Sequence, residues 1–331
     1  MSFWQGRQVL VTGAGGFIGS HLTEALLDAG ARVRVLIRYH SAGRRGFLDE
    51  LTDERQQHLE VFASTVEDPF AVAKAVHGCD TVFHLAALIG IPYSYDAPHH
   101  YVTTNVQGTL NILQACRQAG VRRLVHTSTS ETYGTAQYTP IDEKHPLVGQ
   151  SPYSASKIGA DQMAVAYHRS FDLPVAILRP FNTFGPRQSA RAIIPTILTQ
   201  LISGAPQLRV GSLDPKRDLN YVADTVQGFL SIAQCDQAIG EVVNVGSGGT
   251  LTIGDLIEHC FTVTGRRVPV VQDAARVRPD NSEVRVLQAD IRKAQALFAY
   301  QPSVGLVAGL QRTADWLAQN LHRYRPGEYN V

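Results

Sequence analysis

A glycine-rich turn close to the N-terminus restricts the folds open to this chain. The segment Gly13 to Gly19 has glycine at every third position, follows an apolar run (Gln8 to Thr12) and opens an amphipathic stretch over residues 18–29. A strand that turns sharply into a helix can bring its backbone against a pyrophosphate, whose charge binds to free N–H groups at the helix N-terminus. Glycine is needed because a side chain would block that approach, so the turn predicts a dinucleotide site. Its predicted contacts are Gly13, Gly16, Phe17, Ile18 and Gly19.

Short β-branched runs alternate with amphipathic stretches through the rest of the first half. Strands are predicted at 32–37, 59–63, 81–85, 124–127 and 175–178. Helical patterns lie between them, notably at 69–76, 101–119 and 153–171. This alternation favours a parallel sheet covered on both faces. The predicted fold class is therefore α/β, a Rossmann-type doubly wound parallel sheet.

The alternation of strand and helix patterns becomes less regular after about residue 180, where proline and glycine become frequent. Strands are predicted at 241–245 and 268–271, and helices at 253–263, 290–298 and 304–322. Because no linker or repeat separates the halves, we expect the second half to pack on the sheet. The predicted domains are residues 1–180, to which some later segments return, and a smaller C-terminal α/β substrate-binding region over 181–331.

Charge balance and cysteine spacing exclude several classes of protein. The 331 residues carry 30 Lys and Arg against 29 Asp and Glu, a formal net charge of +1. That balance argues against nucleic-acid binding and against a polybasic membrane-surface protein. No run approaches the ~18 apolar residues of a membrane helix, and the N-terminal run is too short for a signal peptide. The 4 cysteines form no CxxC pair and the 12 histidines no paired ligand spacing, so we expect a cytoplasmic protein without a metal site.

The end of the second predicted strand bears on the choice of dinucleotide. NAD sites usually place Asp or Glu there to bind the ribose 2′-hydroxyl, whereas this chain has Arg38 and no carboxylate. An arginine can pair with a 2′-phosphate, which favours NADP over NAD. The alternative is that Arg38 only stacks on the adenine, as arginines do whether or not the phosphate is present.

Tyr153 and Lys157 lie four residues apart, and on a helix they share a face. The Lys157 ammonium is then expected to lower the pKa of the Tyr153 phenol, so that Tyr153 can remove a proton from a hydroxyl. A hydroxyl-rich segment at the end of the fifth strand contains Thr129, Ser130 and Glu131. Since ligands sit at the carboxyl ends of parallel strands, these three residues and Tyr153 are predicted to share one pocket.

Several motifs together resemble the NAD-dependent epimerase/dehydratase family of extended short-chain dehydrogenases/reductases, which act on nucleotide-diphosphate sugars. The motifs are 13–19, Phe83-His84-Leu85-Ala86-Ala87, Asn105, 127–134, Tyr153 with Lys157, Arg179-Pro180-Phe181-Asn182 and 278–284. A narrower likeness, at 87–95, 134–138, 186–191 and 329–331, is to the 4,6-dehydratases of legionaminic acid biosynthesis, which use a nucleotide-linked N-acetylglucosamine. The resemblance covers essentially the whole chain.

The resemblance implies roles for further residues. It implies cofactor contacts from Val66, Leu85, Ala86 and Ala87, in addition to Tyr153 and Lys157. It implies substrate contacts from Asn182, Arg191, Arg217 and Arg278, of which the arginines suit a diphosphate because the planar guanidinium can bond two oxygens at once. Relatives also pair two long helices from each subunit into a four-helix bundle, so a homodimer through 101–119 and 154–170 is expected.

Glu131 separates the reactions that the family performs. A 4-epimerase needs no carboxylate beside C5 of the sugar, whereas a 4,6-dehydratase needs one to remove the C5 proton. Some dehydratases have Asp where this chain has Ser130, while GDP-mannose dehydratases and UDP-glucuronate decarboxylases share Thr-Ser-Glu. We therefore expect a 4,6-dehydratase acting on an NDP-N-acetylglucosamine, UDP favoured. The alternatives are a 4-epimerase, a decarboxylase and a non-catalytic dinucleotide-binding regulator.

Overall fold

The structure is a computed structural model that describes residues 2–277, 279–326 and 328. Its centre is a seven-stranded parallel sheet with the strand order β11-β6-β5-β4-β1-β2-β3. The strands are β1 (Gln8–Thr12), β2 (Arg32–Ile37), β3 (Leu59–Ala63), β4 (Thr81–His84), β5 (Arg123–Thr127), β6 (Val175–Pro180) and β11 (Val242–Val245). The strand order reverses at β1, which pairs with β2 on one side and β4 on the other, as in a doubly wound fold. The α/β class and the parallel sheet are thus confirmed.

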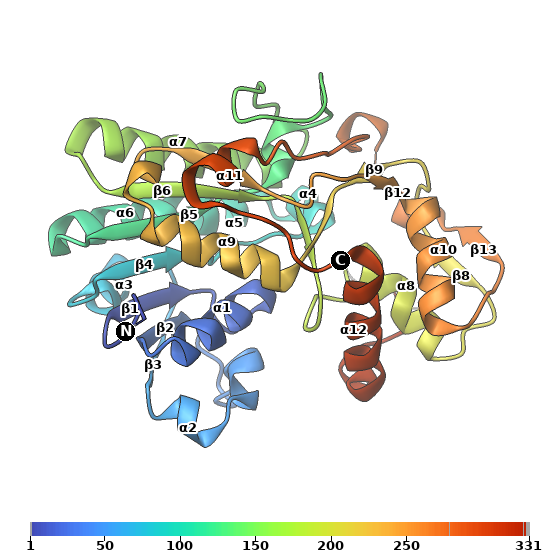
Figure 1. Ribbon diagram of the computed structural model, residues 1–331, viewed down its shortest axis with the longest axis horizontal. Helices are drawn as coiled ribbons and strands as arrows, with labels where there is room; N and C mark the ends of the chain where they lie inside the picture. The colour runs from blue at the N-terminus through green and yellow to red at the C-terminus, as the bar shows by residue number, and fades with distance from the viewer. Residues whose placement is uncertain (1, 278, 327, 329–331) are drawn as a thin grey trace.

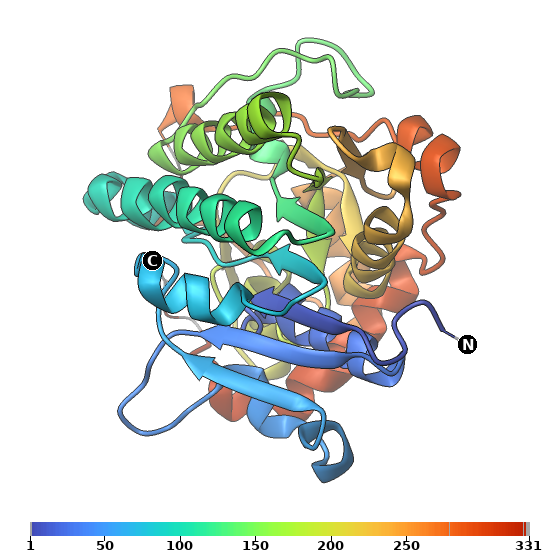
Figure 2. The same cartoon turned by 90° about the vertical axis from the view of Figure 1, so that its left-hand side faces the viewer.

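Helices cover both faces of this sheet (Figure 2). One face carries α1 (Phe17–Asp28) and α9 (Val222–Gln234), and the other carries α3 (Pro69–Val76), α6 (Gly108–Ala119) and α7 (Pro152–Phe171). Local signals define their ends: Asp68 caps α3, Ser151 forms a capping box on α7, and Gly120 ends α6 in a left-handed conformation. Shorter helices lie at α2 (Asp53–Gln56), α4 (Ile91–Asp96), α5 (Pro98–Tyr101) and α11 (Arg292–Phe298).

The helix expected over 101–119 departs from the prediction. Residues Val102–Gln107 form a π-helix, η2, between α5 and α6. A π-helical turn inside an α-helix often marks a functional site. Here it contains Asn105, whose contacts are described below.

The second part of the chain forms a smaller unit at one end of the sheet (Figure 1, right). It contains helices α8 (Ile193–Ile202), α10 (Ile253–Thr264) and α12 (Leu306–Gln319). Its strand pairs are β7 (Asn182–Phe184) with β10 (Leu219–Tyr221), β9 (Lys216–Arg217) with β12 (Leu251–Thr252), and β8 (Leu208–Val210) with β13 (Val270–Gln272). One hydrophobic cluster runs from Val11 in β1 through Phe184 to Leu310 in α12, so the two parts share a continuous core. Strand β11 also returns to the sheet beside β6.

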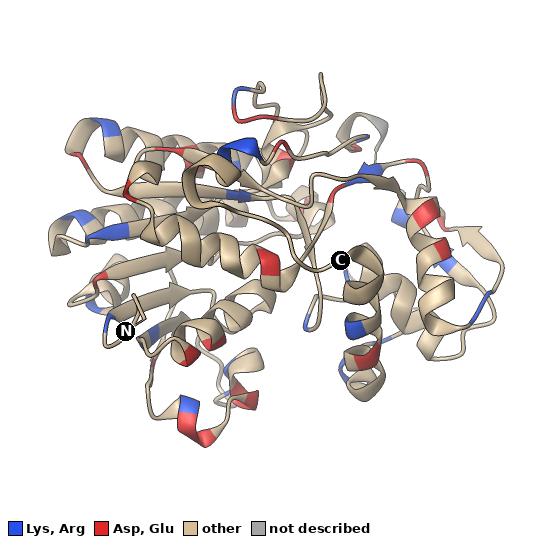
Figure 3. Ribbon diagram, in the orientation of Figure 1, with Lys and Arg blue, Asp and Glu red and all other residues tan. Residues whose placement is uncertain are grey.

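Charged residues of both signs are interspersed along the described chain (Figure 3). No helix in the described residues is long and apolar enough to cross a membrane. Of the cysteines, Cys79, Cys116 and Cys260 are buried, and Cys235 is partly exposed.

Candidate active site

A cavity of about 930 Å³ opens at the carboxyl ends of the strands. It extends from the glycine turn, past the ends of β4, β5 and β6, to the second part of the chain. The predicted site residues that line it are Gly13, Gly16, Phe17, Ile18, Gly19, Arg38, Val66, Leu85, Ala86, Ala87, Thr129, Ser130, Glu131, Tyr153, Lys157, Asn182, Arg191 and Arg217. Arg278, which the resemblance also implied, lies outside the described residues.

The glycine turn is shaped to admit a phosphate group. Gly13 has φ +71°, and a Cβ built on it would lie 2.8 Å from the Ala86 backbone nitrogen. A Cβ on Gly19 would collide with the carbonyl oxygen of Gly13. Helix α1 follows Gly16, which supplies no side-chain cap, and has no acidic residue in its first turn. Its first N–H groups therefore face the cavity uncapped, which fits a dinucleotide pyrophosphate.

A buried chain of hydrogen bonds holds the end of β4 against the end of β1. The Thr12 hydroxyl accepts from the backbone N–H groups of Leu85 and Ala86, both at 3.1 Å, and lies 2.8 Å from Nδ1 of His84. Because this hydroxyl already accepts two hydrogen bonds, it donates its own proton to Nδ1, so the His84 Nε2–H donates to the Thr109 hydroxyl at 3.1 Å. Burial lowers the pKa of His84 well below its usual range, which agrees with this neutral form.

The π-helix connects the cofactor side of the cavity with Tyr153. Asn105 accepts from the Leu88 N–H at 2.8 Å and donates to the Ser156 hydroxyl at 2.9 Å. Ser156 in turn donates to the Tyr153 carbonyl at 2.7 Å. Asn105 thus fixes both the segment after β4 and the start of α7, a contact that sequence reasoning named only as part of a family motif.

Tyr153 lies almost fully buried beside Thr129 and Glu131. Burial raises the pKa of its phenol above the usual value, and a hydrogen bond with the Thr129 side chain lowers that pKa in part. The nearby Glu131 carboxylate raises the Tyr153 pKa further. In the protein alone the pKa of Tyr153 is therefore raised and not lowered as expected, because desolvation of the phenolate outweighs the hydrogen bond with Thr129.

Lys157 is buried one helical turn beyond Tyr153. Its ammonium donates to the Thr127 carbonyl at 2.6 Å, at the end of β5. Burial lowers the pKa of Lys157 to about 8, against the opposing effect of the Asp161 carboxylate. The lysine is thus anchored to the strand end that carries Thr129 and Glu131.

Arg38 lies directly after β2 and is exposed at the cavity edge, next to Tyr39, whose side chain is 69% exposed. Both are within the part of the cavity that also contains Ser64, Thr65 and Val66. Val66 is buried, and its carbonyl accepts from Asn111 at 2.9 Å. This edge is where the adenosine end of a dinucleotide would lie, given the position of the glycine turn.

The predicted substrate residues lie on the other side of the cavity. Arg217 donates to Glu283 at 2.9 Å, so a carboxylate partly neutralises it in this structure. Oδ1 of Asn182 is buried without a hydrogen-bond partner among the described residues, which suits a ligand contact. The Arg191 guanidinium lies beside Gly90 and contacts the Ser189 hydroxyl at 3.4 Å.

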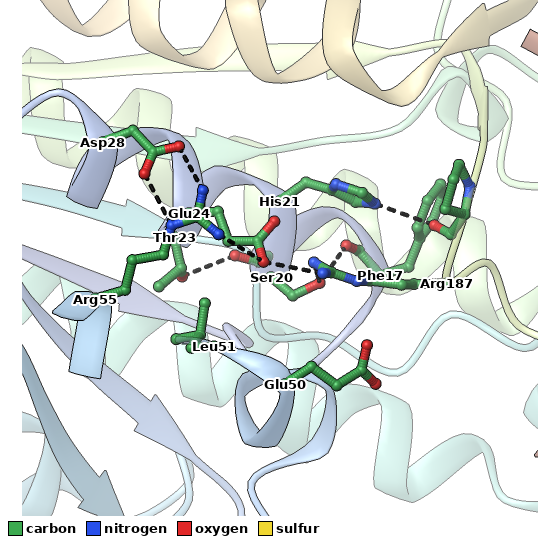
Figure 4. Close-up of polar contacts among 12 residues, drawn as sticks. Phe17, Ser20, His21, Thr23, Glu24, Asp28, Glu50, Leu51, Arg55 and Arg187 are labelled. Carbon is green, nitrogen blue, oxygen red and sulfur yellow. Dashed lines mark hydrogen bonds and ion pairs between the residues drawn. The ribbon is translucent and has the colours of Figure 1, made fainter. Parts of the chain in front are cut away.

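Helix α1 also holds the loop around Arg187 (Figure 4). Gln188 and Arg191 follow in that loop and line the cavity. Arg187 has φ +70°, and its guanidinium donates to Glu24 at 2.9 Å and to Ser20 at 3.3 Å. His21 on the same helix bonds the Pro186 carbonyl at 3.1 Å. The helix that begins at the glycine turn is therefore tied to the loop that lines the substrate side.

Two charged residues beside the site, Asp161 and Arg179, were not predicted from the sequence to be site residues. Asp161 on α7 and Arg179 on β6 form a buried ion pair at 2.7 Å behind Lys157. The available signal was spacing, because positions 153, 157 and 161 recur every four residues and share a helix face. Among the described residues, no group of three or more His, Cys, Asp or Glu side chains could hold a metal ion.

Comparison with known proteins agrees with this geometry. Residues 10–313 match the model of the GDP-mannose 4,6-dehydratase family. The chain belongs to this family. It is thus a member of the extended short-chain dehydrogenases/reductases of the NAD-dependent epimerase/dehydratase type, an enzyme that modifies nucleotide sugars.

Relatives within this family catalyse different reactions. The dTDP-glucose 4,6-dehydratase of Streptomyces venezuelae, solved with NAD and TYD bound, is 33% identical with a TM-score of 0.85, covering 96% of this chain and 98% of that one. The UDP-glucuronic acid 4-epimerase of Bacillus cereus, solved with UDP-glucuronic acid and NAD, is 29% identical with a TM-score of 0.85, covering 95% and 99%. A UDP-N-acetyl-α-D-glucosaminuronate decarboxylase of Bacillus cytotoxicus is 28% identical, covering 95% and 98%.

Proposed function

We propose that this member of the family is a nucleotide-sugar 4,6-dehydratase. Its substrate would be a nucleoside-diphosphate N-acetylglucosamine, UDP favoured, and its product the corresponding 4-keto-6-deoxy sugar. The observation that carries the proposal is the position of Glu131, whose carboxylate shares the cavity with Tyr153 and acts electrostatically on its phenol. A carboxylate at that point is required for dehydration and superfluous for 4-epimerisation.

Tyr153 is the proposed base for the C4 hydroxyl. Thr129 hydrogen-bonds its phenol, and Lys157 lies on the same helix face. The residues of the glycine turn would hold a nicotinamide dinucleotide, whose ring would supply the chemistry for reversible hydride transfer with C4 and C6 of the sugar. The positive charge of that ring and of Lys157 favours the Tyr153 phenolate once the site is filled, which offsets the effect of burial in the protein alone.

Glu131 removes the C5 proton, which is acidic once C4 is a ketone. The C6 hydroxyl then leaves as water with that proton, and C5 regains a proton that the Glu131 carboxylate takes up from solvent. At the position where some relatives have an acidic residue, this chain has Ser130, which is buried. A serine hydroxyl is a far weaker acid than a carboxyl group and does not supply the proton in its place. Glu131 is therefore also the proposed proton donor to the departing oxygen.

The diphosphate of the substrate is proposed to contact Asn182, Arg191 and Arg217, with Arg278 as a further contact implied by the family resemblance. Arg217 would exchange its bond with Glu283 for phosphate oxygens, a change that a charge-assisted bidentate contact favours. The proposal of an N-acetylglucosamine substrate and of a role in legionaminic acid biosynthesis is supported by residues 87–95 and 186–191, which resemble the 4,6-dehydratases of that pathway.

For the cofactor we propose NADP ahead of NAD, tightly bound and recycled. Arg38 is exposed at the adenosine end of the cavity, and no carboxylate ends β2. Denaturation of the purified protein followed by mass spectrometry of the released nucleotide distinguishes the two. Release of NAD alone would refute the preference.

We also propose a homodimer through a four-helix bundle formed by the η2–α6 segment and α7. The Val102 side chain, 53% exposed on η2, and the exposed Phe171 at the end of α7 leave apolar surface on these helices. Light scattering should give twice the mass of one chain, and Val102→Lys should reduce it to one chain. A monomer in the unaltered protein would exclude the dimer.

The function is tested by incubation with a set of nucleotide sugars, without added reductant, read by mass. The proposal predicts loss of one water from UDP-N-acetylglucosamine. Loss of carbon dioxide from UDP-glucuronate would establish the decarboxylase, and an isomer of unchanged mass would establish the epimerase.

A further inference from the structure

A cluster of buried charged residues lies directly behind the proposed catalytic lysine. Asp161 accepts three hydrogen bonds: from the Ser128 hydroxyl at 2.5 Å, from Arg179 at 2.7 Å and from Nε2 of His126 at 3.2 Å. All four of these side chains are buried, and Asp161 is only 1% exposed. A carboxylate with three donors in a dry interior is held in one position.

The same cluster determines the shape of the end of β5. Arg179 donates through Nε to the Ser128 hydroxyl at 3.1 Å, so Ser128 bridges the ion pair. Ser128 directly follows Thr127, whose carbonyl accepts the Lys157 ammonium, and directly precedes Thr129. Asp161 therefore fixes the backbone on which both the lysine anchor and the Tyr153 partner depend.

Charge also connects Asp161 with Lys157. Asp161 lies one helical turn beyond the lysine on α7, so the two share a face. The charged and titratable groups around the ammonium are His84 from β4, His126 from β5, Arg179 from β6 and Asp161 and Tyr153 from α7, with Tyr101 and Glu131 facing the Tyr153 end. Burial lowers the pKa of both histidines, so they are neutral near pH 7. Two buried cations, Lys157 and Arg179, then share one buried anion.

We propose that Asp161 is a positioning residue, which supplies the negative charge that keeps Lys157 protonated in the dry interior and, through Ser128 and Arg179, fixes the strand end that anchors it. This inference rests on the catalytic role proposed for Lys157. A buried ammonium without a counter-charge would lose its proton, and an uncharged amine no longer stabilises the Tyr153 phenolate.

The test reads the protonation of Lys157 directly, without any substrate. The chain has five lysines, at 74, 144, 157, 216 and 293, so ε-¹³C-labelled lysine gives a small set of resonances. The Lys157 resonance is the one lost in Lys157→Met. Titration of the full chain as purified should show Asp161→Asn lowering the Lys157 midpoint by at least one pH unit.

Ser128→Ala is the matched control. It removes one hydrogen bond from Asp161 but no charge, so the Lys157 midpoint should stay within about 0.3 units of the unaltered protein. If Asp161→Asn does not fold, Arg179→Gln tests the effect of neighbouring charges on Lys157 in the opposite direction. The Arg179 charge lowers the Lys157 pKa, so its removal should raise that pKa. The midpoint must then rise.

An unchanged midpoint in Asp161→Asn, or no rise in Arg179→Gln, would overturn the inference. Either result would leave the proposed dehydratase untouched, since the titration measures no turnover. Conversely, absence of dehydration by the unaltered protein would remove the proposed function without moving the Lys157 midpoint.

Discussion

Replacement of Gly13 by alanine tests whether the glycine turn is required by its geometry. Gly13 combines a left-handed φ of +71° with close approach to Ala86. The backbone conformation alone costs a residue with a Cβ about 1–2 kcal/mol. The new Cβ would also lie 2.8 Å from the Ala86 nitrogen, which the Thr12 hydroxyl holds at 3.1 Å and which cannot easily move. Overpacking of this kind adds roughly 1–3 kcal/mol, so we expect a loss of about 3 kcal/mol in the free energy of unfolding.

The matched control is Gly120→Ala. Gly120 has φ +63° at the end of α6, and nothing lies within 4 Å of a Cβ built on it. It carries the backbone cost without the contact, so its loss should be only about 1–2 kcal/mol. Urea denaturation measures both free energies, and titration calorimetry measures dinucleotide binding.

Binding should distinguish the two variants more clearly than stability. A shift of the turn that relieves the Ala86 contact displaces the N–H groups at the start of α1, so Gly13→Ala should bind the dinucleotide at least about tenfold more weakly, or 1.4 kcal/mol. Gly120→Ala should bind it normally. Equal losses of stability in the two variants, with unchanged binding in both, would refute the reasoning.

Three further predictions concern the carboxylates and the lysine. Glu131→Gln should lower kcat for dehydration by about 10²–10⁴-fold and leave the cofactor bound, as turnover assays and nucleotide release would measure; full activity would disprove its role. Because burial depresses the folded-state pKa of Lys157 to about 8, its charge destabilises the folded state below that pH, and the free energy of unfolding should rise as pH passes from 8 to about 10.5. Lys157→Met should therefore lack this rise with pH in denaturant titrations; the same rise in Lys157→Met would contradict this. Glu24→Gln removes the charged partner of Arg187 and leaves only its bond to Ser20, so it should raise KM for the nucleotide sugar several-fold, whereas Asp28→Asn, which removes only an Arg55 partner, should not.

Most of the fold could be predicted because local patterns and global topology agree. The β-branched runs of the first half each match one strand, the helical patterns at 69–76 and 153–171 each match one helix, and the glycine turn lies between β1 and α1 as predicted. The π-helix at 102–107 could not be predicted, since no residue type marks the change in hydrogen bonding. It follows from tertiary contacts of Asn105 with Leu88 and Ser156.

The residues of the candidate site that belong to sequence motifs could be predicted. The properties that depend on how deeply a side chain is buried could not. Residues at strand ends, such as Thr129 and Glu131, reach the cavity because parallel strands end at the same edge. The raised pKa of Tyr153 in the protein alone could not be predicted, because the degree of desolvation is set by packing from Tyr101 and α4 that spacing does not reveal. The Arg179 and Asp161 pair was missed for the same reason, since only the fold brings β6 behind α7.

The proposed dehydration is tested most directly by turnover of UDP-N-acetylglucosamine in D₂O, read by mass and by NMR. We expect a product that has lost one water, carries one deuterium at C5 because Glu131 exchanges that proton with solvent, and has the former C4 hydrogen on C6. A product of unchanged mass with no deuterium at C5 would contradict it.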